Sequence, residues 1–455
     1  MPNTFAYIAL IVWPLYSLYL FKKKEALTAV FITIVGGYLI LPVKVFFDFP
    51  LIPPLDKNSI VSIIALVGCV YVKRIKIPVI PKKGLERVFV IILLLSPILT
   101  VLNNQDRIYD LDRNLPGLTY HDALSMIINQ YIVLIPFFLG LQLVKSRDDV
   151  NKLLKFFVIS CLLYSLLILI EIRMSPQLHS WLYGFFPHNF GQTKRLDGFR
   201  AVVFLGHGLL IAMFVAISLA SAAILWKEKI KIYNFSPVLI ILFLFTVLIL
   251  SKSMAAFLLG SFLMIAISWM PISIVKRSSW IIVFVIIFYP ALSLLNIFPH
   301  QGLVELAASI DVDRAQSLAF RFDHEERLLD HAQEKIFFGW GGWGRNRLAD
   351  SVTDGLWILS LGTTGLVGFI SLFGLFTFTI RKAIKASDVL TNKKEKRLIL
   401  SFALIISIIL IDQLLNASLN MPVFLLAGAL LGFSKEILLK KNNILDQNAS
   451  KKFKV

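Results

Sequence analysis

Long apolar stretches, separated by short polar segments, run along the whole chain. A helix needs about 17–25 apolar residues to cross roughly 30 Å of hydrocarbon, and thirteen stretches come close to that length. The pattern therefore predicts an all-α polytopic integral membrane protein with about 12–13 transmembrane helices. The predicted spans are 5–21, 26–41, 59–72, 88–102, 123–144, 154–172, 201–226, 236–250, 254–274, 279–298, 354–380, 398–416 and 421–434.

The polar segments between these spans predict a single integral membrane domain over residues 1–455. Segments 103–121, 173–200 and 299–353 are long, and 299–353 is expected to form a large exterior loop. No basic residue precedes the first apolar stretch and no small-residue cleavage site follows it. We therefore expect a retained span there and not a signal peptide.

Lysine and arginine gather in one alternating set of loops. That set holds 31 of the 46 basic residues, whereas the opposite set holds 15 basic residues and 18 acidic ones. Cytoplasmic loops of membrane proteins carry the excess of positive charge. We therefore expect the N-terminus outside and the C-terminus in the cytoplasm.

The composition agrees with a membrane location. Hydrophobic residues make up 57% of the chain and charged residues 16%, against about 45–50% and about 25% in ordinary globular chains. The net charge of +18 would suit nucleic acid, but it is concentrated in the loops predicted to be cytoplasmic. It is interpreted as a topology signal and an attraction to headgroups, which makes membrane lipids expected partners and excludes nucleic acid.

Residues with acid–base or redox chemistry are unevenly distributed. Cys69 and Cys161 both lie inside apolar stretches, so neither a disulfide framework nor a thiolate metal site is expected. All seven histidines fall in predicted exterior loops or at the outer ends of spans. Any chemistry is therefore expected at the exterior face.

Cations at the outer ends of predicted spans are candidate anion ligands. Residues 194–200 (KRLDGFR) include Arg195 and Arg200 and lead into the span that contains His207, while Lys252 lies between two serines in a turn between two spans. Snorkelling to the interface and an ordinary solvated turn are the alternatives. The scarcity of exterior basic residues favours anion binding.

Within the large exterior loop, residues 317–336 have the pattern of an amphipathic helix. Arg321 and Glu325, and likewise Asp323 and Arg327, are four residues apart and predict ion pairs on the helix surface. A charged surface helix without a further role is the alternative. The functional interpretation makes the arginines phosphate ligands and Glu325 a candidate base.

The next segment, 337–347 (FFGWGGWGRNR), combines glycine, tryptophan and arginine. Its glycines match G-x-G-x-x-G, but no strand precedes them and no βαβ unit is possible, so dinucleotide binding is not expected. Glycines beside Trp340 and Trp343 favour a backbone that bends close to a flat group such as a sugar ring, with Arg345 alongside.

The string Asp354-Gly-Leu-Trp357 opens the following span. The glycines of 362–368 in that span are interpreted as a helix-packing face. A carboxylate in the first turn of a helix is favoured by the helix dipole, and Asp354 also borders the arginine-rich loop. We expect Asp354 to accept the proton of a hydroxyl group.

These strings, in this order, resemble the O-antigen ligase and O-antigen polymerase superfamily of bacterial membrane glycosyltransferases. The resemblance covers roughly residues 190–370, and the first six spans resemble the family only in hydropathy. It is carried by RLDGFR at 195–200, by Arg321 and Arg327 followed by FGWGGWG at 338–344, and by DGLW and GTTG within 354–365.

The resemblance implies a metal-independent, inverting glycosyltransferase without a cofactor, with a GT-C-like membrane fold, on the outer face of the bacterial inner membrane. Its donor would be a glycan on undecaprenyl pyrophosphate, with a second glycan as acceptor and a chain-length regulator as a candidate partner. The resemblance gives pyrophosphate binding to Arg195, Arg200, Lys252, Arg321 and Arg327, catalysis to Asp354 or Glu325, and glycan binding to Trp340, Trp343, Arg345, Trp357 and His207.

Two positions depart from the family pattern. Ligases of the family tend to have histidine where Asp354 stands and arginine where Lys252 stands. The aspartate favours a polymerase, or an exopolysaccharide-type relative, over a ligase that acts on a lipid A core. Lys252 supplies charge but not the bidentate fork of an arginine.

Two other functions stay open. The nearest is a ligase that transfers a finished glycan to another acceptor, and the second is a flippase for lipid-linked oligosaccharides or another transporter. Transporters usually place ionisable groups near the midplane and consist of repeated halves. This sequence has no internal repeat, and Asn129 and Gln130 are the nearest polar candidates at that depth, which favours a glycosyltransferase.

Overall fold

The computed structural model describes residues 1–49, 52–110, 113–195, 198–352 and 355–452 of the chain. Asp354, the predicted base, lies outside the described residues. The described residues are predominantly helical and their strands are two or three residues long. The predicted all-α polytopic membrane fold is confirmed.

Apolar helices occupy the position of every predicted span. Within the described chain, nine helices are long and apolar enough to cross a membrane: α1 (Thr4–Lys23), α5 (Leu85–Leu102), α6 (Tyr120–Leu143), α7 (Arg147–Met174), α9 (Gly208–Lys227), α12 (Ile272–Leu294), α15 (Leu356–Val389), α16 (Lys393–Leu415) and α17 (Met421–Lys452). Shorter apolar helices are α2 (Ala26–Phe31), continued by η1 (Ile32–Gly36) and α3 (Gly37–Ile40), α4 (Lys57–Val67), continued by η2 (Gly68–Val72), α10 (Pro237–Leu250) and α11 (Met254–Ser268).

The remaining elements lie between these helices. They are the helices α8 (Leu178–Tyr183), η3 (Phe190–Thr193), α13 (His300–Ala308) and α14 (Val312–Gln333), and the antiparallel pairs β1 (Phe46–Phe47) with β2 (Leu55–Asp56), β3 (Ile108–Asp110) with β4 (Arg113–Leu115), and β5 (Lys194–Arg195) with β6 (Gly198–Phe199). Helix α14 confirms the helix that the sequence predicts over 317–336.

Helices α9, α16 and α17 are mostly buried at the centre of the bundle, whereas α1 and α12 are mostly exposed at its rim. The backbones of α6 and α17 approach closely, because both helices have a glycine at the contact. A Cβ atom on Gly140 would meet the Leu425 carbonyl oxygen, and one on Gly428 would meet the Phe137 carbonyl oxygen. Such small residues allow the close packing that holds helices together in lipid.

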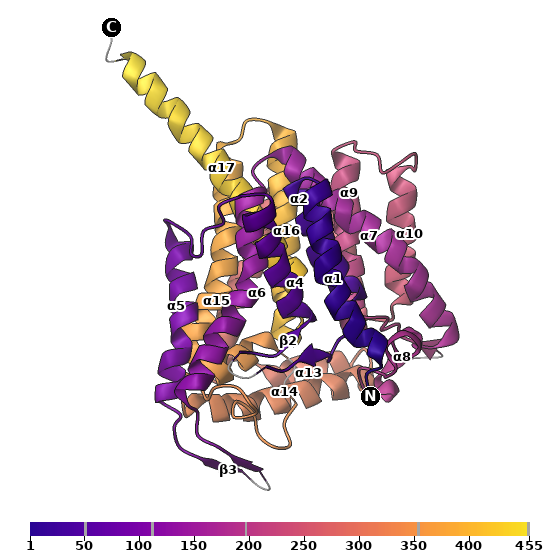
Figure 1. The fold of residues 1–455 in the computed structure, drawn as a ribbon, viewed down its shortest axis with the longest axis vertical. Helices are drawn as coiled ribbons and strands as arrows, with labels where there is room; N and C mark the ends of the chain where they lie inside the picture. Colours follow the sequence, from indigo (N-terminus) through magenta and orange to yellow (C-terminus); the bar gives the residue numbers. More distant parts are fainter. Residues whose placement is uncertain (50–51, 111–112, 196–197, 353–354, 453–455) are drawn as a thin grey trace.

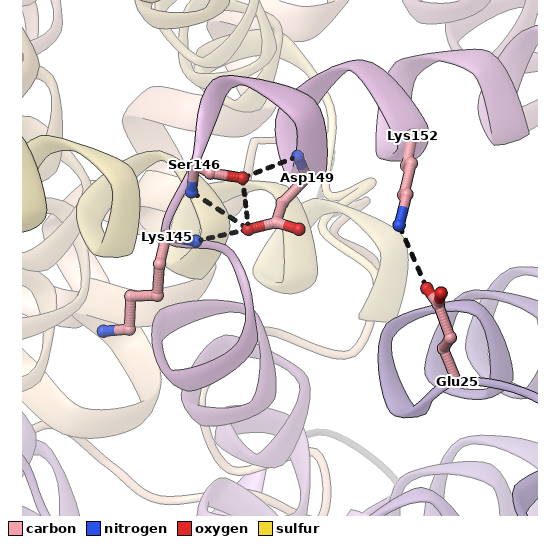
Figure 2. A network of polar contacts seen from close by, with 5 residues as sticks. All are labelled: Glu25, Lys145, Ser146, Asp149 and Lys152. Atoms are coloured by element: carbon pink, nitrogen blue, oxygen red, sulfur yellow. Dashed lines mark hydrogen bonds and ion pairs between the residues drawn. The ribbon is translucent and has the colours of Figure 1, made fainter.

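A polar cap sets the start of α7, which begins at Arg147 and not at residue 154 as hydrophobicity predicts. The Ser146 hydroxyl accepts a hydrogen bond from the Asp149 backbone N–H at 3.2 Å, and the Asp149 carboxylate accepts one from the Ser146 backbone N–H at 2.9 Å (Figure 2). This capping box satisfies N–H groups that a bare helix end leaves without partners.

A buried carboxylate delays the start of α9, which begins at Gly208 although the apolar stretch begins at residue 201. Glu171 of α7 accepts hydrogen bonds from the backbone N–H groups of Val202 and Val203, at 2.8 and 2.7 Å. Those N–H groups are thereby satisfied without a helix. The segment that directly follows Arg200 is thereby tied to α7.

The two ends of the bundle differ in what they contain. The N-terminus, α8, α13, α14 and β3 lie together at the lower end in Figure 1, and the C-terminal end of α17 projects from the opposite end. The elements at the lower end belong to the long segments 103–121, 173–200 and 299–353. The side of a membrane that this end faces stays a prediction.

Candidate functional site

Arg195, Arg200 and Lys252 are joined by hydrogen bonds between two segments. Arg200 directly follows β6, and Lys252 occupies the turn between α10 and α11. Arg200 Nη2 donates to the carbonyl oxygen of Lys252 at 3.1 Å, and Lys252 Nζ donates to the carbonyl oxygen of Arg195 at 3.1 Å. Gly198 makes room for the ammonium group, because a Cβ atom there would lie 2.6 Å from Lys252 Nζ.

Arg200 is the buried member of this group, with only 8% of the residue exposed. Its Nε atom has no hydrogen-bond partner among the residues that the structure describes. Burial, followed by the positive charges of Arg195 and Arg321, lowers the pKa of the Arg200 guanidinium to about 10. Arg321 on α14 therefore lies within electrostatic range of Arg200.

His207 lies beside the same cations but supports the helix. Its Nδ1 atom accepts a hydrogen bond from the Leu209 backbone N–H at 3.1 Å and so caps α9. Burial, followed by the charges of His188, Arg200 and Arg195, lowers the pKa of His207 to about 4. The ring is therefore neutral at physiological pH, as a capping acceptor requires.

Arg321 connects this group to the end of α16. Its Nη1 atom donates to the Leu415 carbonyl oxygen at 3.4 Å. In the same turn the buried Asp412 accepts hydrogen bonds from Asn416 Nδ2 at 2.8 Å and Ser418 Oγ at 2.9 Å, within electrostatic range of Arg321. Sequence analysis missed Asp412; an acid inside an apolar stretch was the signal that could have found it.

Glu325 faces inward from α14, one helical turn after Arg321. Its Oε1 accepts a hydrogen bond from the Tyr289 hydroxyl at 2.5 Å, and its Oε2 accepts one from Trp357 Nε1 at 3.3 Å. Burial raises the pKa of Glu325 to about 7, although both hydrogen bonds act in the opposite direction. A carboxyl group with this pKa exchanges a proton near neutral pH.

Two cavities border Glu325. A cavity of about 20 Å³, enough for a single water molecule, is bordered by Arg321, Glu325 and Gly355. A larger one of about 270 Å³ is bordered by Glu325 and His300, whose Nε2 atom lies 3.8 Å from Glu325 Oε1. Asp354 directly precedes Gly355 in the sequence.

Arg327 differs from the other predicted phosphate ligands because a carboxylate already binds it. Its Nη2 atom donates to both carboxylate oxygens of Asp350 at 2.6 Å. The hydrogen bonds and charge of Asp350, followed by the weaker effect of Asp323, raise the pKa of Arg327. A phosphate at Arg327 would have to compete with Asp350, which the sequence pattern did not suggest as its partner.

Trp340 and Arg345 are engaged within the protein. The Trp340 ring stacks on His331 with 4.5 Å between ring centroids, and Lys335 Nζ lies over the ring at 4.7 Å from its centroid. Arg345 is buried and donates to backbone carbonyl groups, including that of Pro116 at 2.7 Å. Trp340 therefore packs within the long loop, whereas Arg345 ties that loop to the segment between α5 and α6.

Trp343 and Trp357 have opposite surroundings. Trp357 is fully buried and contacts Tyr289 edge-on, with 5.8 Å between ring centroids. Its indole N–H donates to Glu325 Oε2, and its buried ring is not open to a glycan. Trp343 is 54% exposed, so its ring is open to a ligand.

The glycines of the long loop contact α15, where the sequence predicted a sugar-binding bend. Backbone hydrogen bonds join Trp340 N–H to the Gly362 carbonyl oxygen at 2.7 Å and Leu366 N–H to the Ile336 carbonyl oxygen at 2.7 Å. Gly365 interrupts the α15 geometry with φ 66° and ψ −168° and leaves these groups free to pair. The prediction that the glycines of 362–368 pack against another helix is therefore not confirmed. A Cβ atom on Gly362 would lie 2.9 Å from the Asn346 carbonyl oxygen and one on Gly365 would lie 2.3 Å from the Phe337 backbone, so these glycines face the long loop.

No protein-family model matches the chain, and no curated protein matches it. The described residues form a multi-pass membrane protein in which hydrogen bonds join Arg195, Arg200 and Lys252. Arg321 lies within electrostatic range of Arg200 and borders a cavity with Glu325, at the end of the bundle that carries the long loops.

Proposed function

We propose that the protein is a membrane glycosyltransferase that polymerises, or transfers, oligosaccharide units linked to undecaprenyl pyrophosphate on the outer face of the bacterial inner membrane. The reaction is metal-independent and inverts the anomeric centre. The observation that carries the proposal is a group of cations, Arg195, Arg200 and Lys252, with Arg321 in electrostatic range of Arg200. Arg321 also borders a cavity with Glu325, a carboxyl group whose pKa is about 7.

The cations suit the leaving group of such a reaction. When a sugar leaves undecaprenyl pyrophosphate, negative charge develops on the phosphate oxygen that departs. Fixed guanidinium and ammonium donors stabilise that charge most effectively where water is scarce. Arg200 is buried, and its Nε has no hydrogen-bond partner within the described part of the chain, so it is suited to an anion that enters the site.

Glu325 suits the acceptor side of the reaction. The acceptor hydroxyl oxygen forms a bond to the anomeric carbon while the bond from that carbon to the pyrophosphate oxygen breaks. The hydroxyl proton passes to the carboxylate, and the pyrophosphate retains the electron pair of the broken bond. General-base assistance of this kind contributes about 10²–10⁴-fold to the rate.

Asp354 remains the other candidate base in this proposal. Its sequence neighbour Gly355 borders the small cavity together with Arg321 and Glu325. Glu325 and Asp354 are alternative bases, and one of them receives the hydroxyl proton.

The test is polymerisation of a purified lipid-linked oligosaccharide by the purified protein, with and without a chelator. Replacing Arg200 by glutamine removes the buried charge and is expected to lower the rate about 10²–10³-fold, while Arg200→Lys keeps the charge and part of the rate. Arg107→Gln removes an exposed charge on the loop before β3 and serves as the control. Full activity of Arg200→Gln would overturn the proposal.

The same assay separates the nearest alternatives. A polymerase converts single lipid-linked units into long lipid-linked chains, whereas a ligase consumes long chains only when a separate acceptor is supplied. Asp354 in place of histidine favours the polymerase. A flippase would leave the glycan on its original lipid in both mixtures, and this result would remove the glycosyltransferase assignment.

A further inference from the structure

A cavity of about 460 Å³ lies at the opposite end of the bundle from the candidate site. It is bordered by the α6–α7 connection, the α15–α16 connection and the side of α17. Helix α16 extends from this cavity to the turn beside Arg321 and has 23 residues, which corresponds to about 35 Å. The cavity is therefore separate from the site described above.

The cavity has an apolar wall and a basic rim. Its apolar lining residues are Val389, Leu390, Phe433 and Ile437, and its basic ones are Lys145, Arg147, Lys440 and Lys441. Two carboxylates, Glu395 and Glu436, also border it, so positive charges exceed negative ones by two among the described lining residues.

The lysines of the rim are available to a ligand. Arg147 is bound by Glu228 through its Nε atom at 2.7 Å, whereas the Nζ atoms of Lys145, Lys440 and Lys441 have no hydrogen-bond or ion-pair partner among the described residues. Figure 2 shows the Lys145 side chain directed away from the Asp149 carboxylate that binds its backbone N–H.

We propose that this cavity binds an anionic phospholipid, with the phosphate at Lys145, Lys440 and Lys441 and an acyl chain along Phe433 and Ile437. An apolar wall under a basic rim fits an amphiphile better than a free anion, which needs no apolar contact. Basic pockets between helices at the membrane edge are suited to lipid headgroups. Helix α17 continues past the bundle (Figure 1) and carries further lysines.

The environment of Lys145 is consistent with this ligand. Burial lowers the pKa of Lys145, while the charge of Glu436 raises it and that of Lys435 lowers it. A phosphate beside the ammonium group would favour its charged form. The net excess of positive charge would fall but stay positive when one monoanionic phosphodiester is bound.

The test uses the full-length protein in nanodiscs that contain equal amounts of phosphatidylcholine and phosphatidylglycerol, with lipids retained on the protein counted by native mass spectrometry. The wild-type protein is expected to retain phosphatidylglycerol. The triple variant Lys145→Gln, Lys440→Gln, Lys441→Gln is expected to retain about tenfold less, because each lysine near a headgroup contributes to attraction.

The matched control is Lys22→Gln, Lys23→Gln, Lys24→Gln, which removes the same charge from an exposed cluster at the C-terminal end of α1. It should retain phosphatidylglycerol as the wild type does. If the triple variant unfolds in phosphatidylcholine alone, the retention of phosphatidylglycerol is compared between the single Lys145→Gln variant and the wild type.

Equal retention by the test and control variants would overturn the proposal. The proposal would also be overturned if millimolar inorganic phosphate displaced phosphatidylglycerol from the protein and by itself stabilised the protein against unfolding as much as the lipid does. That result would assign the cavity to a free anion. Lipid retention and its competition by phosphate do not depend on glycosyltransferase activity, so these experiments test the lipid site independently of the proposed function.

Discussion

Glu325 titrates near neutral pH because burial raises its pKa to about 7, against the opposing hydrogen bonds of Tyr289 and Trp357. A base acts in its ionised form, so the reaction rate should rise with pH through about 7 and then level off. Glu325→Gln should remove this rise and lower the rate about 10²–10⁴-fold. The measurement is the initial rate of polymerisation as a function of pH.

The control for this variant is Glu326→Gln, which neutralises the exposed neighbouring carboxylate on the same helix. It should keep both the rate and the pH dependence of the wild type. If the polymerisation rate of Glu325→Gln still rose with pH through about 7, the titrating group would be another residue.

The stability of the protein should depend on the same carboxyl group. The pKa of Glu325 is about 7 in the folded protein and 4.5 as its ordinary value, so between these pH values the folded protein binds the proton more tightly than the unfolded chain. The free energy of unfolding should therefore fall as pH rises through this window. Thermal unfolding midpoints should show a flatter pH dependence for Glu325→Gln than for Glu326→Gln.

Lys252 contributes charge from a strained turn, with a backbone φ of 49°. Replacing it by methionine removes the ammonium group, and the KM for the lipid-linked donor should rise about tenfold or more, as expected for a lost charged hydrogen bond. Lys229→Met is a matched control, because Lys229 lies in the α9–α10 connection with a φ of 58°. Equal KM values for the two variants would remove Lys252 from donor binding.

Among the secondary-structure elements, α15 depends on Gly365. Its φ of 66° and ψ of −168° belong to a region that is essentially restricted to glycine, and a Cβ atom there would meet the Phe337 backbone. Gly365→Ala should lower the free energy of unfolding by about 1–3 kcal/mol from backbone strain alone. Thermal unfolding would measure this.

Gly302→Ala on α13 is the control for that substitution, since a Cβ atom at Gly302 has nothing within 4 Å. Its unfolding midpoint should match the wild type. If Gly365→Ala were equally stable, the loop would not depend on the break in α15.

The positions of the helices could be predicted from the sequence, because the length of an apolar stretch reports the thickness of hydrocarbon directly. Their ends were predicted less well. The start of α9 depends on the carboxylate of Glu171, which lies 37 residues before Gly208. The break at Gly365 depends on a backbone pairing with the distant loop. Neither interaction leaves a local pattern.

The orientation of the whole molecule can be tested with single cysteines. Native Cys69 and Cys161 are fully buried and should stay unlabelled by a membrane-impermeant maleimide in intact cells. Because basic loops favour the cytoplasm, Gly302→Cys should be labelled from outside, and Lys22→Cys only after the membrane is permeabilised. The reverse result would place the candidate site in the cytoplasm.

The candidate site could be predicted only in part. The family resemblance named Arg200, Lys252 and Arg321 together, and the structure brings them within electrostatic or hydrogen-bond range. The resemblance could not indicate that Asp350 binds Arg327 or that Trp357, which donates to Glu325, is buried. Such roles depend on partners that are distant in sequence and meet only after the helices have packed.

The fastening of residues 336–341 to α15 restricts how this end of the long loop can move. Backbone hydrogen bonds such as that from Trp340 to Gly362 tie the end of the long loop to a membrane helix, so this end cannot swing away like a hinged lid. Any displacement of α15 would therefore carry this end of the loop along with the helix, and a rearrangement of the loop would have to break those backbone hydrogen bonds first.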